Sequence, residues 1–251
     1  MTRYCLKLQY FGKNYCGSQK QNTDPTIQQE LEKALSTLIK QKISTIFSGR
    51  TDAGVSALAQ SAHFDTNKEI DPDKFRYSMN SILPDDIVVS EIFKVENDFH
   101  AQMSAKYRHY QYKIRTTRTP SPFDVNVFYT RQKLDADRLN TALQALAGEH
   151  DFSAFKSTSD NPAKVCEIFK VTAKKETNLE GDYITIDIIG NRFLYNMVRT
   201  IVGTLLMIEK DNLSPLTMAQ ILESKDRTQA GPTADPIGLT LVEVGYQKYQ
   251  Q

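Results

Sequence analysis

The order of hydrophobic patterns along the chain constrains its fold more than any other feature of the sequence. Tyr4, Leu6, Leu8 and Tyr10 alternate with other residues, as on a half-buried β-strand. A segment of helical spacing follows, opened by the sequence Asp-Pro-Thr at 24–26, and its apolar residues lie on one face. The first half continues as strand, strand, helix, strand, so the expected elements cover residues 4–10, 24–39, 43–47, 60–64, 71–83 and 87–95.

The second half repeats this order loosely. It begins with an alternating strand that carries Tyr110 and Tyr112 on one face, and a helix that stops at Gly148 comes next. Two paired strands follow, with turn residues Glu180-Gly181-Asp182 between them. Residues 116–131, rich in Thr, Pro and Arg, are expected to form a loop or insertion. The expected elements cover residues 106–115, 135–147, 165–173, 183–189, 193–210, a short helix after 214–215, and 239–246.

A β-α-β-β-α-β order that occurs twice predicts an α+β fold built from two ferredoxin-like halves. We expect the halves to share a central, mostly antiparallel sheet with helices packed on one face, and an active-site cleft to lie between them. The N-terminal half is assigned to residues 1–104 and the C-terminal half to residues 105–251. No low-complexity linker separates them, which predicts a close junction.

Composition narrows the classes of protein that need consideration. The chain has 251 residues, 40% of them hydrophobic, and a net charge of +1, which is ordinary for a soluble globular protein. Three scattered cysteines and four histidines, with no Cys-x-x-Cys pair, favour neither a structural zinc site nor a disulfide framework. The start has no signal-peptide pattern and no apolar stretch is long enough to span a membrane, so a cytoplasmic location is expected.

The segment Gly49–Val55, Gly-Arg-Thr-Asp-Ala-Gly-Val, joins two strand-like runs and carries the candidate carboxylate, Asp52. Glycines let a loop approach a ligand closely, and catalytic groups are often carried on loops held by rigid strands. The alternative is an ordinary hairpin in which Arg50 and Asp52 are solvated or paired. The motif contains one acid rather than the pair used by glycosidases, which suits nucleophilic or base chemistry.

Two further residues stand out. Arg199 lies in an apolar helical segment, where a buried guanidinium needs an anionic partner or a satisfied hydrogen-bond network. That partner is either Asp52 or an acid elsewhere in the core.

Tyr110 lies in a strand that interleaves aromatic and basic residues. This pattern is suited to stacking on bases beside phosphates, although ordinary strand packing would also account for it.

The chain resembles the TruA family of tRNA pseudouridine synthases. The Asp52 segment resembles the family's catalytic loop, and the segment from Met197 to Gly203 resembles its Met-Val-Arg-x-Ile-Val-Gly motif. Further matches, in the family's order, are Phe-His-Ala at 99–101, Asp-Phe-Ser-Ala-Phe at 151–155 and the segment from Asp226 to Leu239. Three positions depart from common family residues: Ser18 replaces Trp, Ser56 replaces His and Gln102 replaces Arg.

The resemblance implies isomerisation of uridine to pseudouridine at positions 38, 39 and 40 in the anticodon arm of tRNA, with no cofactor and no metal. It implies that Asp52 is catalytic, that Tyr110 stacks on the target base, and that Arg199 pairs with Asp52. Arg50 is expected to fill the space left by the flipped uridine or to grip a phosphate. It also implies a homodimer in which one tRNA contacts both subunits. Asp52 acts either as a nucleophile or as a base.

Two other functions stay open at this level. A non-catalytic RNA-binding protein on the same scaffold would not need Asp52, which is present. A hydrolase of RNA or nucleosides would need a second carboxylate or a metal cluster. The basic residues near the motifs predict a positive cleft for tRNA, and they are Arg50, Lys106, Arg108, Arg115, Arg118, Arg131, Lys156 and Arg192.

Overall fold

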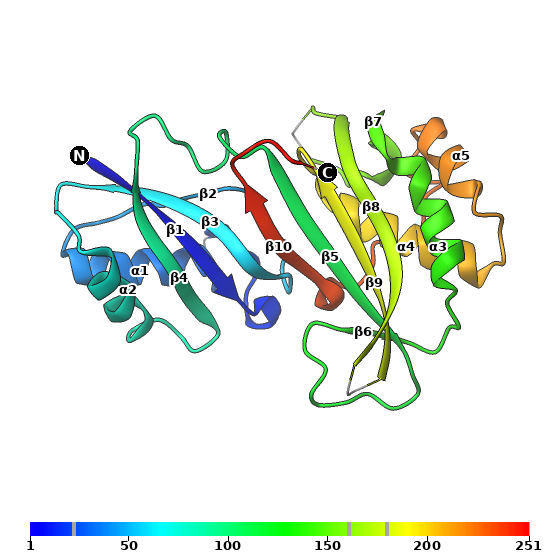
Figure 1. Cartoon of the computed structure of the whole chain (residues 1–251), viewed down its shortest axis with the longest axis horizontal. Coiled ribbons are helices and arrows are strands. Elements are labelled where there is room, and N and C mark those ends of the chain that lie inside the picture. The colour runs from blue at the N-terminus through cyan, green and yellow to red at the C-terminus, as the bar shows by residue number, and fades with distance from the viewer. Residues whose placement is uncertain (22–23, 160–161, 179–180, 251) are drawn as a thin grey trace. The chain divides into compact units, whose positions relative to one another are not determined.

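The computed structural model describes residues 1–21, 24–159, 162–178 and 181–250 and divides them into two compact units (Figure 1). The first unit comprises residues 1–106 and 240–248. The second comprises residues 107–239 together with 249 and 250. Each unit is a mixed α/β structure built on mostly antiparallel strands.

The first unit contains a sheet in the order β4-β1-β3-β10, with β2 paired to β3. All of these pairings are antiparallel except that of β3 with β10, which is parallel. The last strand of the chain therefore completes the sheet of the N-terminal unit. The elements are β1 (Thr2–Tyr10), α1 (Ile27–Ile39), β2 (Ile46–Phe47), β3 (Ser56–Thr66), α2 (Pro72–Asn80), β4 (Ile87–Val95) and β10 (Leu239–Gly245).

The expected burial of Tyr4, Leu6, Leu8 and Tyr10 on β1 is confirmed, while the other face is mixed, with Cys5 buried and Gln9 exposed. In Figure 1, α1 lies behind the strands. Its buried residues lie along one face of the helix and are Ile27, Leu31, Ala34, Leu35 and Ile39. The helix begins with a capping box, in which Thr26 and Gln29 satisfy each other's backbone N–H groups. Local sequence thus fixes where this helix starts.

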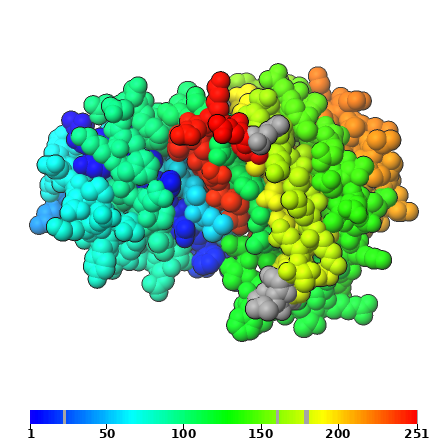
Figure 2. Space-filling model, in the orientation of Figure 1, coloured from blue at the N-terminus to red at the C-terminus, as the bar shows by residue number. Residues whose placement is uncertain are grey.

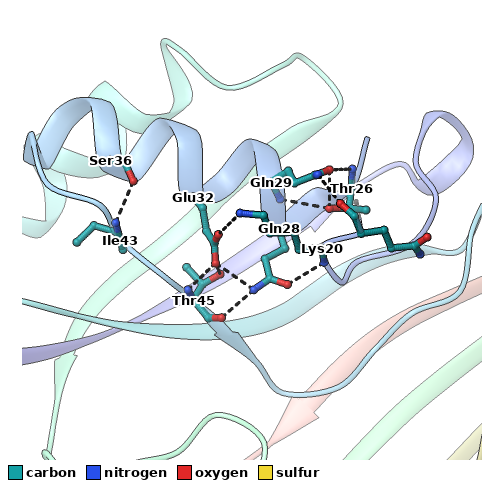
Figure 3. Close-up of polar contacts among 9 residues, drawn as sticks. Lys20, Thr26, Gln28, Gln29, Glu32, Ser36, Ile43 and Thr45 are labelled. Atoms are coloured by element: carbon teal, nitrogen blue, oxygen red, sulfur yellow. Dashed lines mark hydrogen bonds and ion pairs between the residues drawn. The ribbon is translucent and has the colours of Figure 1, made fainter. Parts of the chain in front are cut away.

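The segment that leads into β2 is held by polar side chains of α1 (Figure 3). The Glu32 carboxylate accepts hydrogen bonds from the backbone N–H and the hydroxyl of Thr45, at 2.8 and 3.2 Å. Gln28 donates to the Thr45 carbonyl at 2.9 Å, and the Ile43 N–H donates to Ser36 at 3.0 Å. These contacts hold the chain where it enters β2.

The second unit contains a sheet in the order β5-β9-β8-β7, all antiparallel, with β6 parallel to β5. In Figure 1, α4 lies behind β8 and β9. Side chains of β8, in yellow-green, form part of the surface of this unit in Figure 2. The elements are β5 (Tyr107–Thr116), β6 (Phe128–Thr130), α3 (Ala136–Leu143), β7 (Gly148–Asp151), β8 (Val165–Asn178), β9 (Gly181–Gly190), α4 (Met197–Lys210) and α5 (Thr217–Ser224).

Most expected elements are present, although several bounds differ and β7 was not expected. The segment 116–131 is not wholly a loop, because it contains β6. The long helix begins at Met197 rather than near residue 193, because Asn196 adopts a left-handed conformation with φ of 60°. The helix expected to reach residue 147 ends at Leu143 and continues as a 3₁₀ turn. Of the predicted turn at 180–182, Glu180 lies outside the described residues.

A buried carboxylate anchors the 116–131 insertion to the strands of the second unit. The Asp124 side chain is 1% exposed and accepts from Arg115 Nη1 at 2.6 Å. The hydroxyls of Tyr129 and Tyr183 also donate to this carboxylate. Arg115 was expected to line a phosphate-binding cleft, but its guanidinium is engaged here instead. Arg115 and exposed Arg118 differ in burial, and the sequence does not show burial. The sequence alone therefore could not tell the two arginines apart.

Candidate active site

The Asp52 loop connects β2 to β3 and ends in a tight turn over residues 52–55. Pairing of the strands ends where the Ser48 N–H donates to the Ser61 carbonyl at 2.8 Å. The Val55 N–H then donates to the Asp52 carbonyl at 3.1 Å, and Gly54, at the third position of the turn, has φ of 80°. A type II turn needs this positive φ, which explains the glycine. Asp52 is half-buried at the first position of the turn.

The residues just before Asp52 are held by side chains from β1 and β3. Gln60 is fully buried and donates from Nε2 to the Gly49 carbonyl at 3.0 Å, while Ser48 donates to its Oε1 at 2.6 Å. The Tyr10 hydroxyl lies 2.8 Å from Thr51 Oγ1. Burial raises the pKa of Tyr10 to about 12, so its hydroxyl stays protonated at neutral pH.

A second segment, residues 11–18, packs along the other side of the loop. Thr51 and Ser18 exchange two hydrogen bonds: the Thr51 N–H donates to Ser18 Oγ at 2.9 Å, and the Ser18 N–H donates to the Thr51 carbonyl at 3.1 Å. The Gly12 N–H donates to Ser56 Oγ at 3.1 Å. A Cβ on Gly12 would lie 2.1 Å from the Val55 carbonyl oxygen, so only glycine fits there.

Ser18 and Ser56 are two of the three departures from the family's common residues. Each has its hydroxyl oxygen within hydrogen-bonding distance of a backbone N–H in or beside the Asp52 loop. At both positions the serine hydroxyl therefore helps to hold the loop in this chain. From the sequence, Tyr10 was predicted only as a residue of a half-buried strand, and Gln60 was given no role. The one signal that could have pointed to Gln60 is its position, since it is a polar residue within a strand that is otherwise largely buried.

Tyr110 lies on β5, opposite Ile188 of β9, and is partly exposed. Its ring packs edge-on against Phe193, with centroids 5.1 Å apart and planes at 87°. Tyr112, predicted on the same face, is buried in the core, and its hydroxyl donates to the Asp235 carbonyl at 2.8 Å. Of the two tyrosines, only Tyr110 keeps surface that a base can contact.

Arg199 lies in the first turn of α4. It is half-buried, less than the apolar helix predicted. Its Nε donates to the Ala234 carbonyl at 2.8 Å, and Nη1 donates to Asn196 Oδ1 at 3.0 Å. The Ala234 N–H in turn donates to the Arg199 carbonyl at 3.1 Å. These contacts set the direction of the guanidinium within the second unit.

The four predicted site residues thus divide between the units. Asp52 and exposed Arg50 share one loop of the first unit, while Tyr110 and Arg199 belong to the second. The expected pairing of Arg199 with Asp52 stays a prediction. Across the residues that the structure describes, no group of three or more His, Cys, Asp or Glu side chains is placed to hold a metal ion.

Two histidines hold the 99–104 segment in place. His63 is buried on β3, and its Nδ1 accepts the Ala101 N–H at 3.1 Å. Burial, reinforced by the nearby charges of Arg3 and His100, lowers the pKa of His63 to about 4. His100 Nδ1 accepts the N–H groups of Gln102 and Met103, each at 3.2 Å. Both rings therefore act as hydrogen-bond acceptors that shape the 99–104 segment.

A family model described as tRNA pseudouridine synthase matches residues 8–103 and 142–247. The chain belongs to the tRNA pseudouridine synthase family. The matched segments include the Asp52 loop in the first unit and Arg199 in the second, and they leave out the strand of Tyr110. Membership makes the chain an isomerase that converts uridine in tRNA to pseudouridine.

Relatives of known name agree with this family. A protein named tRNA pseudouridine synthase A from Francisella tularensis subsp. tularensis (strain SCHU S4 / Schu 4) is 39% identical, over 99% of this chain and 96% of that protein. One of the same name from Francisella philomiragia subsp. philomiragia is 37% identical over the same shares. The resemblance to the TruA family is thereby confirmed. A chain in a crystal structure of a Cbf5-Nop10-Gar1 complex matches with a TM-score of 0.43 and 8% identity, over 95% of this chain and 49% of that one.

In the part of the chain that the structure describes, no helix combines the length and the apolar character needed to cross a membrane.

Proposed function

We propose that the chain isomerises uridines at positions 38, 39 and 40 of the tRNA anticodon arm, and that Asp52 is the catalytic carboxylate. The single observation that carries the assignment of Asp52 is the loop itself. Its backbone is held on both sides by buried hydrogen bonds, while the acid begins the turn and is only half-buried. Catalytic groups need this kind of fixed placement, because small displacements from the reactive geometry are costly.

The reaction is redox-neutral and leaves the composition of the RNA unchanged. The bond from ribose C1′ to N1 of uracil breaks, the base turns, and C1′ bonds to C5. The proton on C5 is lost and N1 gains one, so atoms balance without a cofactor. Asp52 acts either as a nucleophile or as a base that removes a ribose proton.

The other site residues are assigned to binding. A uridine within a stem must leave the helix first, at a cost of a few kcal/mol. We assign Tyr110 to stacking on the flipped base, since it is the partly exposed tyrosine on its face of β5. Arg50 is exposed beside Asp52 and is assigned to the vacated space or a phosphate. Arg199 is assigned to pairing with Asp52, which would favour the ionised carboxylate.

We also propose that the enzyme works as a homodimer in the cytoplasm and needs no cofactor. The location is supported by the cysteines, since Cys5, Cys16 and Cys166 are all free thiols. The dimer rests on the resemblance to the TruA family, and light scattering of the purified protein tests it.

The decisive experiment measures tritium release from tRNA labelled at C5 of uridine. We expect release from tRNAs whose uridine lies at position 38, 39 or 40, and none from tRNA in which all three positions are another base. Asp52→Asn should abolish release while folding is retained, because the side chains are nearly isosteric. The control is Asp85→Asn, an exposed aspartate of the same unit, which should keep full activity.

Turnover by Asp52→Asn comparable to that of Asp85→Asn would remove Asp52 from its role. Release from tRNA that lacks uridine at all three positions would show that the position assignment is wrong while leaving the isomerase activity intact.

A further inference from the structure

A chain of buried hydrogen bonds connects β3 and β1 to the residue next to Asp52. Gln60 has no exposed surface, and both ends of its carboxamide are fully used. Its Oε1 accepts from Ser48 Oγ at 2.6 Å and from the Ser61 N–H at 3.1 Å. Its Nε2 donates to the Gly49 carbonyl at 3.0 Å and to the Tyr10 hydroxyl at 3.4 Å. One side chain thus holds the start of the loop at two successive residues.

Tyr10 extends this chain of contacts to Thr51. Its hydroxyl is buried at the end of β1 and lies 2.8 Å from Thr51 Oγ1. Because the hydroxyl accepts from Gln60, its own proton is available for Thr51. Tyr10 and Thr51 lie 41 residues apart in the sequence, so the contact depends on the pairing of β1 with β3.

Thr51 is fixed at every polar group. Its N–H and its carbonyl are both bonded to Ser18, and its hydroxyl is bonded to Tyr10. The peptide that joins Thr51 to Asp52 is therefore held from the core side, and with it the Cα atom of Asp52. The direction in which the Asp52 carboxylate leaves the loop depends on this peptide.

We propose that Tyr10 and Gln60 are positioning residues for Asp52, acting through the hydrogen bond to Thr51. The inference rests on the proposed catalytic role of Asp52 and goes beyond it by naming what sets the position of the carboxylate. A misplacement of about 1 Å in a catalytic group can cost about 100-fold in rate. Binding of tRNA, which depends on surface charge and stacking, does not depend on this buried network.

The test compares two tyrosines on the same face of the same strand. Tyr10→Phe removes the hydroxyl that contacts Thr51. Tyr4→Phe removes an equally buried hydroxyl, 3% exposed, which accepts the Ile70 N–H at 3.2 Å away from the loop. We expect kcat for tritium release to fall about 10–100-fold in Tyr10→Phe with KM for tRNA unchanged within about twofold. In Tyr4→Phe both constants should stay within about twofold of wild type, although both variants lose similar thermal stability.

A second pair of variants tests the same bond from its other end. Thr51→Val removes the hydroxyl that faces Tyr10, and Thr45→Val is the control, because Thr45 is also buried but binds Glu32. If Tyr10 and Thr51 act through one hydrogen bond, the double variant Tyr10→Phe/Thr51→Val should be no slower than the slower single variant.

Equal kcat values for Tyr10→Phe and Tyr4→Phe, or for Thr51→Val and Thr45→Val, would overturn the proposal and leave Tyr10 a packing residue. The second pair decides the question if Tyr10→Phe does not fold. Failure of the proposed function is a separate result, since it would appear as no tritium release from the wild-type enzyme or as full activity in Asp52→Asn.

Discussion

Loss of Asp124 should destabilise the protein far more than loss of an aspartate whose ion pair has the same length. Asp124 and Arg115 are 2.6 Å apart, and so are Asp182 and Lys175 in the same unit. The two pairs differ in burial: the Asp124 side chain is 1% exposed and the Asp182 side chain is 54% exposed. The two ion pairs therefore have the same length but differ in burial and in the groups that donate to the carboxylate.

The size of the effect follows from what each substitution leaves behind. Asp124→Ala removes the shared acceptor of one guanidinium and two tyrosine hydroxyls. Removing one partner of a buried pair costs about 3–5 kcal/mol, and we expect about 2–4 kcal/mol because Arg115 retains some contact with solvent. At about 2–4 °C per kcal/mol, Tm should fall by about 4–16 °C. Asp182→Ala should change Tm by less than about 2 °C, because exposed ion pairs contribute little.

The dependence on pH provides a second check on this explanation. Burial alone would raise the pKa of Asp124, but the hydrogen bonds from Tyr183, Arg115 and Tyr129 outweigh it and hold the pKa below its ordinary value. A carboxyl with a depressed folded pKa stabilises the protein above its unfolded pKa of about 3.9, and this contribution is lost as pH falls through the folded pKa. The Tm difference between wild type and Asp124→Ala should therefore be full at pH 7 and shrink in acid.

The assay is thermal unfolding followed by circular dichroism or calorimetry, for wild type and the two variants, at pH 7 and in acid. Equal shifts in Tm for the two variants would refute the reasoning, because burial would then make no difference. A Tm difference for Asp124→Ala that did not change with pH would show that packing, rather than the carboxylate, is responsible.

Three further outcomes are expected. Burial lowers the pKa of His63 to about 4, so between about pH 6.5 and 4 the unfolded chain binds a proton that the folded protein does not. Stability to urea should therefore fall as pH falls through this range. His63→Asn should flatten this dependence on pH, and an unchanged dependence would contradict the explanation. Tyr110→Phe should bind tRNA as wild type does, whereas Tyr110→Ala should lose about 1–3 kcal/mol of binding, and equal Kd values would show that stacking is absent. Binding of tRNA should weaken steeply as the salt concentration rises. Arg118→Glu changes an exposed arginine of the insertion and should reduce the slope of log Kd against log salt by about one. Arg115→Lys, at the arginine that pairs with Asp124, should leave the slope unchanged.

Local sequence determined the elements and the family. The alternation on β1 and the apolar face of α1 are short-range patterns, and each formed the element that it predicted. The Asp52 segment is a continuous string of seven residues, so its similarity to a catalytic loop was visible without any structure. Patterns of this kind need only neighbours within a few residues.

Only the tertiary structure decided which of several similar residues are buried and which distant residues they contact. Arg115 and Arg118 are three residues apart in one basic segment, yet burial beside Asp124 engages the first and leaves the second exposed. Tyr10 contacts the Asp52 loop because the pairing of β1 with β3 brings Gln60 and Thr51 to its hydroxyl. β10 completes the first sheet from the far end of the chain. Such contacts depend on strand register across long separations, and no local periodicity encodes the register, because a shift by one residue would exchange which side chains meet.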